Sequence, residues 1–484
     1  MDQKVKNARI LFKVLALFTL MFFVMSVMAV VMKIDSTTLT GKNGIWANFL
    51  KILGTPAQCT QDMYGISVAG TYFNMGMCCL LMLAYIVLCG GLNAVNSGTV
   101  AAFFLTVGFS SWGMNVLNML PLMLGMQVYA LIKKKTPVSM MNLGIFATAI
   151  APIMSEVMLR WPGYPLGKGG ATIGLANINP TGIILALVIA ILFCLFYPPM
   201  CAKAPNFHFG CDLFNAGPPA GFLCLMTIGF LMKVPNVGSV AFNTTNPLAE
   251  GADLSKVVVT VNNGPGFAKE VFEFVLISYL AVFVICFILG TMLDKDALKN
   301  YGKLIKDSGH GSDFVEKYGI GATLVNFAVY GVFILAFYTC MKFCFGAQFG
   351  GGIAGVVWCA FTWVAAGAHP LNVLPIGIGY VLISLVSKNV FPALGIGANS
   401  GRMGMDTVAI LIAFSYATGM APISGKYGVI WGIIAGMMHF AIVTLIPLQY
   451  DFFNFYNGGF TAGVVAFVLI PFIEHYFPAK ADAK

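Results

Sequence analysis

The chain has 484 residues, of which 59% are hydrophobic and only 9% are charged, and its mean hydropathy is +0.86. A soluble domain is about 25% charged, so this composition excludes a soluble enzyme, a nucleic-acid-binding domain and a disordered regulator. The net charge of +9 is the usual basic excess of membrane-protein loops and does not indicate a nucleic-acid partner. The chain is predicted to be an integral membrane protein.

The first predicted membrane helix begins near the amino terminus. Lys4, Lys6 and Arg9 precede an apolar run from Ile10 to Met32, which is long enough for a membrane span and longer than the apolar part of a signal peptide. Further runs of about 18 apolar residues follow. They predict about fourteen membrane helices, with broken or re-entrant helices among them, at 10–32, 66–89, 94–111, 113–132, 138–159, 180–200, 213–232, 271–293, 323–345, 350–367, 370–387, 403–421, 428–447 and 459–476.

Loop charges predict the orientation. With the amino terminus inside, the lysines at 133–135 and the basic segment Lys295–Lys317 fall on the cytoplasmic side, as expected from the bias of lysine and arginine toward cytoplasmic loops. An even number of helices returns the carboxyl terminus to the cytoplasm. We therefore expect a multi-pass protein of the cell inner (plasma) membrane with both termini cytoplasmic.

Three patterns occur twice, in the same order, along the chain. An Asn-x-Leu-Pro-x-x-x-Gly pattern recurs at an offset of 254, an Ala-Thr-x-x-Ala-Pro-Ile pattern at 270, and a Phe/Tyr-Asn-x-Gly pattern at 242. Such agreement predicts a duplicated unit, with the first transmembrane repeat at 10–232, an external linker at 233–270 and the second repeat at 271–476. The paired residues are Asn118 with Asn372, Pro121 with Pro375, Thr148 with Thr418, Asn215 with Asn457, and Gly217 with Gly459.

An odd number of helices in each copy predicts that the second copy enters the membrane from the opposite face. The loops agree, because three lysines follow the Asn-x-Leu-Pro helix in the first copy and only Lys388 follows it in the second. Inverted repeats build transporters around a substrate site near the bilayer midplane. The predicted fold is therefore an all-α polytopic membrane protein made of two inverted seven-helix repeats.

The Asn-x-Leu-Pro-x-x-x-Gly helix and the Tyr-Asn-Gly-Gly-x-x-Ala-Gly segment near the carboxyl terminus resemble an uncharacterised bacterial membrane-protein family. That family is catalogued as a domain of unknown function, number fifteen seventy-six, and the resemblance covers most of the chain. It implies no activity. A fainter similarity is to urea transporters, which are also duplicated and carry a Tyr-Asn-containing segment in each half; their Asn-Pro filter entry is missing here.

The paired motifs supply the candidate substrate-binding residues, each with a structural alternative. Pro121 and Pro375 each free a carbonyl group inside a helix, and Asn118 and Asn372 either bind a polar solute or cap a helix. Asn215 with Gly217, and Asn457 with Gly459, mark helix starts whose free NH groups attract an anion or a polar solute, or are helix caps only. Thr148 and Thr418 mark interrupted helix ends, with close helix packing as the alternative.

Ionisable residues inside apolar runs are candidates by default. His439 is either a transport residue or a hydrogen-bonded core histidine, and Asp406 is expected to pair with Arg402 one turn earlier. No phosphate-binding loop, metalloprotease motif or nucleophile elbow occurs in the sequence. The 12 cysteines form no Cys-x-x-Cys pair, and Cys340 and Cys344 are expected to pack as apolar residues.

The expected function is transport of a small polar solute or ion by a secondary transporter whose site lies between the two repeats. The alternatives are a passive channel of urea-transporter type, a non-transporting membrane subunit, and a membrane enzyme. We expect no catalytic residue, metal or cofactor. The expected partners are the solute, which is neutral or anionic, and the lipid bilayer. The sequence leaves both a monomer and a homo-oligomer as alternatives.

Overall fold

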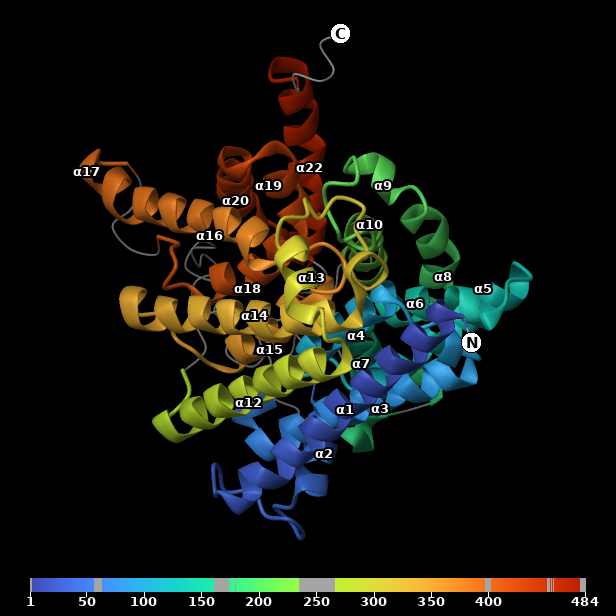
Figure 1. Cartoon of the computed structure of the whole chain (residues 1–484). Helices are drawn as coiled ribbons and strands as arrows, with labels where there is room; N and C mark the ends of the chain where they lie inside the picture. Colours follow the sequence, from blue (N-terminus) through green and yellow to red (C-terminus); the bar gives the residue numbers. More distant parts are fainter. Residues whose placement is uncertain are drawn as a thin grey trace.

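The computed structural model describes residues 2–55, 63–160, 174–178, 180–234, 266–396, 402–450, 453, 455 and 457–478. These residues form helices joined by loops, without a β-strand in the described part (Figure 1). In the first copy the α-helices are α1 (Gln3–Val31), α2 (Ile45–Leu53), α3 (Val68–Leu88), α4 (Ser97–Phe109), α5 (Val116–Ile132), α6 (Pro137–Phe146), α7 (Ala151–Arg160), α8 (Pro180–Cys201), α9 (Ala204–Phe207) and α10 (Gly217–Ile228).

The second copy repeats this order of long and short helices. Its α-helices are α12 (Lys269–Leu293), α13 (Ala297–Leu304), α14 (Phe314–Phe345), α15 (Gly351–Ala360), α16 (Pro370–Leu385), α17 (Phe391–Ala393), α18 (Val408–Ala417), α19 (Ala421–Tyr427), α20 (Val429–Val443), α21 (Ile446–Gln449) and α22 (Asn457–Tyr476). The predicted start of α14 at residue 323 was late, because Asp313 caps an earlier start and the helix kinks at Gly319, where φ is +84°.

Among the described residues, nine helices are long and apolar enough to cross a membrane, and five further apolar helices are shorter. Each of the fourteen predicted segments coincides with one of these helices, so the all-α polytopic membrane fold is confirmed. The short helices are the re-entrant candidates. For example, α4 has 13 residues and is therefore about 20 Å long, which is less than the hydrocarbon thickness of about 30 Å.

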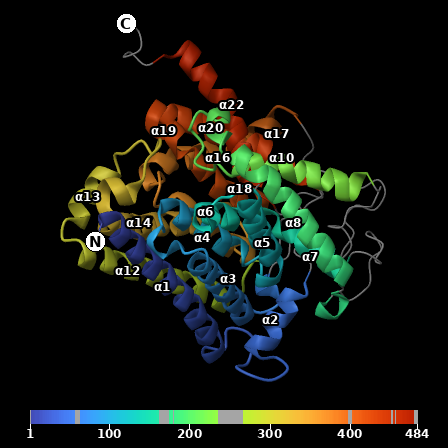
Figure 2. The same cartoon turned by 90° about the vertical axis from the view of Figure 1, so that its right-hand side faces the viewer.

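Equivalent helices pack on equivalent partners in the two copies. Helix α1 lies along α3 as α12 lies along α14, and α5 lies along α8 as α16 lies along α20. Two views at right angles place α22 at one end of the molecule and α2 at the other (Figures 1 and 2). Between the copies, α4 packs on α15 and α10 packs on α22. These two contacts between the copies thus each join a helix to its own counterpart.

Some residues touch their own counterparts in the other copy. The Cys359 thiol lies 3.9 Å from the carbonyl oxygen of Leu105, and the rings of Phe104 and Trp358 stack with centroids 6.3 Å apart. Both pairs are separated by 254 residues, the offset of the surrounding repeat. In a two-fold arrangement, only residues beside the axis contact their own equivalents. An approximate two-fold axis therefore passes between α4 and α15.

Reciprocal aromatic contacts identify the same symmetry at the centre of the molecule. The rings of Phe109 and Tyr416 lie 5.9 Å apart, and those of Phe146 and Trp363 lie 6.4 Å apart. By the repeat offsets, Phe109 corresponds to Trp363 and Phe146 to Tyr416, so each contact is the symmetry mate of the other. The two copies therefore share an aromatic core around the axis.

Candidate functional site

The first Asn-x-Leu-Pro motif forms a tight turn between α4 and α5. The Asn118 Oδ1 accepts a hydrogen bond from the backbone NH of Asn115 at 2.9 Å, while its Nδ2 donates to the carbonyl of Gly113 at 2.9 Å and to the Ser155 hydroxyl at 3.0 Å. From α3, Asn74 Nδ2 donates to the carbonyl groups of Ser110 and Met114. Asn115 is therefore the N-cap of α5, Asn118 is the third residue of the same capping box, and both donors of the Asn118 amide have protein partners.

The second motif repeats this geometry. Asn372 Oδ1 accepts from the NH of His369 at 2.9 Å, and Nδ2 donates to the carbonyl of Gly367 at 2.8 Å. Asn326 holds this turn from α14 as Asn74 holds the first, by donating to the carbonyl groups of Val364 and Ala368. Both glycines that open the turns have positive φ, +152° at Gly113 and +127° at Gly367, which favours glycine there.

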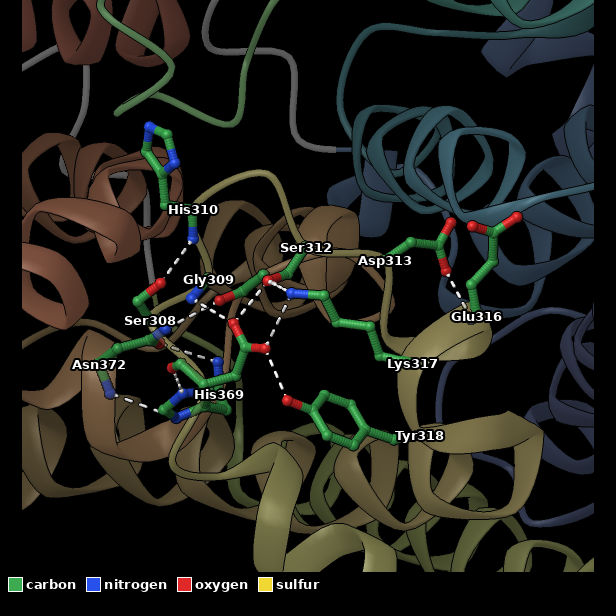
Figure 3. A network of polar contacts seen from close by, with 12 residues as sticks. Ser308, Gly309, His310, Ser312, Asp313, Glu316, Lys317, Tyr318, His369 and Asn372 are labelled. Carbon is green, nitrogen blue, oxygen red and sulfur yellow. Dashed lines mark hydrogen bonds and ion pairs between the residues drawn. The ribbon is translucent and has the colours of Figure 1, made fainter.

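A charged loop contacts the second turn (Figure 3). His369 Nε2 lies 2.8 Å from the carbonyl oxygen of Asp307, whose carboxylate accepts hydrogen bonds from Ser312, Lys317 and Tyr318. Burial opposes ionisation of this carboxyl, but these donors and the NH of Gly309 together lower its pKa to about 2. The Asn372 turn is thus fixed from the loop that precedes α14.

Pro121 and Pro375 are buried within α5 and α16, and neither helix ends at its proline. Beyond each proline, the glycine of the motif approaches a neighbouring helix backbone. A Cβ at Gly125 would stand 2.9 Å from the carbonyl oxygen of Ala190, and one at Gly379 would overlap the carbonyl oxygen of Ile433. These segments therefore provide close packing of α5 on α8 and of α16 on α20.

Thr148 and Thr418 lie in 3-10 turns that interrupt two helices at equivalent positions. These turns are η3 (Ala147–Ile150), between α6 and α7, and η9 (Thr418–Met420), between α18 and α19. Each hydroxyl donates to the carbonyl three residues earlier, Thr148 to Ile145 at 2.6 Å and Thr418 to Ser415 at 2.7 Å. Both threonines are fully buried, so the predicted helix interruptions are present in the core.

The amino-terminal ends of α10 and α22 meet at their glycines. A Cβ on Gly217 would stand only 2.5 Å from the carbonyl oxygen of Gly459, so this is a third contact between counterparts. The prediction that Asn215 caps α10 is wrong. The helix begins later, with Ala216 as its N-cap and prolines in its first turn, and the Asn215 side chain is exposed. Asn457 begins α22, and its buried Oδ1 has no hydrogen-bond partner.

His439 joins three helices of the second copy. Its Nδ1 shares a hydrogen bond with the Tyr380 hydroxyl from α16, and its Nε2 lies 2.9 Å from both the carbonyl oxygen of Gly458 and the hydroxyl of Thr461 in α22. Both ring nitrogens therefore have protein partners. This geometry fits the core-histidine alternative and places His439 beside the start of α22.

The connector between α8 and α10 reaches all three second-copy motifs. The NH of Leu213 donates to the carbonyl of Gly419 at 2.9 Å, and its side chain lies against Gly367. The Phe214 ring packs on Trp363 and Tyr416, with centroids 5.4 and 6.0 Å away. The turn before α16, the helix break between α18 and α19 and the start of α22 thus all lie beside this one connector. We call residues 212–214 with Gly367, Gly419 and Gly463 the Asp212 junction.

Asp212 is the acidic group of this junction. Its side chain is 1% exposed, Oδ1 accepts from the NH of Phe214 at 2.9 Å, and Oδ2 has no hydrogen-bond partner. Burial raises the pKa of this carboxyl to about 8. His208, fully buried one turn earlier, accepts the NH of Asp212 at Nδ1, and burial lowers its pKa to about 4. An acid and an imidazole, both favoured in their neutral forms, therefore lie side by side between the copies.

Sequence reasoning missed Asp212 because this residue lies in a short polar connector outside the apolar runs. One signal was present: Asp212 precedes the repeated Phe/Tyr-Asn-x-Gly pattern by two residues, and at the same offset its counterpart is Asn454. The expected pair of Asp406 with Arg402 is also wrong. Asp406 instead binds the Lys388 ammonium at 2.8 Å, because Lys388 lies just beyond α16 and within reach.

Metal-binding chemistry finds no support in the described part of the chain, where no three His, Cys, Asp or Glu side chains cluster. Cys340 and Cys344 lie with their sulfur atoms 3.5 Å apart on α14, where both are exposed. The expectation that these two thiols behave as apolar side chains stays a prediction. The Asp212 junction offers the carboxyl group of Asp212, backbone peptide groups and the ring of Phe214.

The sequence model of one protein family, described as "Protein of unknown function (DUF1576)", matches residues 41–233 and 293–475. These two segments fall within the two halves of the chain that carry the repeated motifs. Curated proteins and solved structures give no match. The family resemblance is thus confirmed, whereas the similarity to urea transporters stays a prediction.

Proposed function

We propose that this chain, which belongs to the DUF1576 family of proteins of unknown function, is a secondary transporter of a small polar solute or ion. The observation that carries the proposal is the convergence at the Asp212 junction. A helix break, a proline-containing turn and two helix starts from both copies meet there around a buried carboxyl group. Interrupted helices at corresponding positions of two repeats are typical of transporter binding sites.

Helix directions support an inverted arrangement of the copies. The carboxyl-terminal half of α1 and the amino-terminal half of α12 line one cavity of about 690 Å³. At the other end of α1, Lys4 forms an ion pair with Glu316 at 3.0 Å, and the start of α14 lies beside Gly290 at the end of α12. The counterparts α1 and α12 therefore run in opposite directions, and α5 and α16 likewise point to opposite sides of the molecule (Figure 1).

Packing at the centre favours a carrier over an open channel. The rings of Phe109, Phe146, Phe214, Trp363 and Tyr416 fill the space around the axis in mutual contact. A solute passes such a core only when the two copies move relative to each other, as in alternating access. A passive channel of urea-transporter type is the second candidate, and its supporting feature is the internal duplication alone.

The chemistry of the junction suits a neutral polar solute or an anion. The start of α22 at Asn457 supplies the positive end of a helix dipole, whereas α10 offers little NH capacity, because Pro218 and Pro219 have no NH and the NH of Gly217 donates to the carbonyl of Phe214. Threonine hydroxyls and the free Oδ1 of Asn457 add neutral hydrogen-bonding groups. We assign the protein to the cell inner membrane with both termini cytoplasmic, because the lysine-rich loops at 133–135 and 295–317 then face the cytoplasm.

Proteoliposomes containing the purified protein test the proposal. Radiolabelled urea, glycerol, formate and chloride serve as probes, because they cover small neutral solutes and small anions. A carrier gives protein-dependent uptake that saturates with concentration and shows counterflow when the same solute is loaded inside. Uptake that rises linearly without counterflow would support the channel instead. Uptake of all probes at the rate of empty liposomes would contradict transport of these solute classes and favour a non-transporting subunit or an enzyme.

A further inference from the structure

The free oxygen of Asp212 has no assigned role in the proposed site. Asp212 Oδ1 is held by the NH of Phe214, whereas Oδ2 points toward α22, where a Cβ on Gly463 would stand 3.3 Å from it. The Oδ1 oxygen has a second neighbour, Gly419, which lies in the helix break between α18 and α19. The carboxyl group therefore lies between a connector of the first copy and two elements of the second, the helix break after α18 and the first turns of α22.

We propose that Asp212 is the site that binds and releases the coupling proton of this transporter. This inference rests on the proposed transport function. An ionised carboxylate held by one backbone NH, with its second oxygen unpaired, is disfavoured in a buried position, so the group is neutral while the junction is closed. When the copies separate, water reaches Oδ2 and the carboxyl group can release its proton. Opening and closing of the junction is thereby linked to proton release and uptake.

Among the described residues no lysine or arginine pairs with the Asp212 carboxyl group, which burial and the NH of Phe214 alone affect; His310 reaches the same connector, 3.2 Å from the carbonyl oxygen of Phe209. Within the connector, His208 accepts a hydrogen bond at Nδ1 and is neutral at physiological pH, and Cys211 is buried. On α20, His439 is engaged with Tyr380, Gly458 and Thr461. At a half-exposed end of the neighbouring helices, Lys426 of α19 lies 3.8 Å from Glu474 of α22, which also accepts a hydrogen bond from Tyr427.

The two copies differ at this position. The counterpart of Asp212 is Asn454, an amide that cannot titrate between pH 4 and 10. The sequence therefore places a carboxyl group at this motif position in the first copy and an amide in the second. A single proton per transport cycle is the stoichiometry that this difference predicts.

Infrared spectroscopy of the purified protein tests proton binding without any solute. The carbonyl-stretch band of a protonated carboxylic acid should be present at pH 6, decrease toward pH 9.5 in wild type, and be weaker by one group at pH 6 in Asp212→Asn. The matched control is Asp296→Asn, in which an exposed carboxyl group is changed, and it should retain the wild-type band. Glu156 is also buried, so the difference between wild type and Asp212→Asn is the relevant signal. Equal spectra of these two proteins would overturn the proposal.

Coupling is tested in the proteoliposomes with the pH-sensitive dye pyranine trapped inside. Whichever probe enters should bring about one proton with it, and wild-type uptake should fall about tenfold for each pH unit above the titration midpoint. Asp212→Asn, if it still moves the probe by counterflow, should carry no proton. Probe uptake by wild type without proton movement would overturn the inference and leave the transport function intact. Failure of every probe would count against the transport function itself, while the infrared result still decides whether Asp212 binds a proton.

Discussion

The contact between Gly217 and Gly459 provides a quantitative test of how the two copies meet. A Cβ at residue 217 would stand 2.5 Å from the carbonyl oxygen of Gly459, whereas ordinary contacts of this kind begin near 3.4 Å. The substitution Gly217→Ala therefore forces α10 and α22 apart by about 0.9 Å, the difference between these distances. Overpacking of this kind costs about 1–3 kcal/mol. We expect Gly217→Ala to lower the thermal stability of the purified protein in detergent, measured as the fraction that remains monodisperse after heating.

Two matched variants separate this steric effect from the general effect of replacing glycine. A Cβ on Gly459 would have the Phe214 side chain as its nearest neighbour, at 3.3 Å, and a Cβ on Gly229, just after α10, would meet nothing within 4 Å. Gly459→Ala should therefore be mildly destabilising. Gly229→Ala should be neutral or stabilising by up to about 1 kcal/mol, because alanine favours the helix. Equal stability of Gly217→Ala and Gly229→Ala would refute the close crossing of α10 and α22.

Three further predictions follow from the polar contacts. Asn118→Asp and Asn372→Asp each remove the NH donor to a turn carbonyl. Each substitution should therefore destabilise the protein by about 1–3 kcal/mol, as measured by thermal unfolding. Wild-type stability combined with altered uptake would instead support a role of these residues in solute binding. The lowered pKa of Asp307 stabilises the fold above about pH 4, and this contribution is lost as the pH falls toward 2. The difference in unfolding free energy between wild type and Asp307→Asn should therefore shrink over that pH interval. A constant difference would contradict the stabilising role of the ionised carboxylate. The pair of Lys388 with Asp406 is partly exposed, so Lys388→Ala should change stability by less than about 1 kcal/mol, and a larger loss would show that this pair contributes more than its exposure suggests.

The repeated motifs made much of the fold predictable from the sequence. Asn118 and Asn372 lie at equivalent turns with the same partners, and Thr148 and Thr418 lie at equivalent helix breaks. Local patterns of this kind depend on interactions within a few residues, which a single sequence reveals. The short α4 was also visible as an apolar run, but its length was not, because the run continues into the turn that follows.

The acidic group of the site could not be predicted, because its burial depends on the other copy. Asp212 is covered by Gly419 and Gly463, more than 200 residues away in sequence, and nothing near it in the chain indicates such a cover. The cap assigned to Asn215 failed for a related reason. The prolines that follow fix the start of α10 at Gly217, where contact with Gly459 determines the position of the helix.

The inverted arrangement of the two copies is the central claim, and accessibility of single cysteines tests it most directly. Cys340 and Cys344 are exposed and are first replaced by alanine, after which Lys135→Cys and Lys388→Cys are introduced separately. A membrane-impermeant maleimide applied to intact cells should label the Lys388→Cys protein only, and it should label the Lys135→Cys protein only after the membrane is opened. Labelling of both from the same side would contradict the inverted repeats, and with them the shared site between the copies.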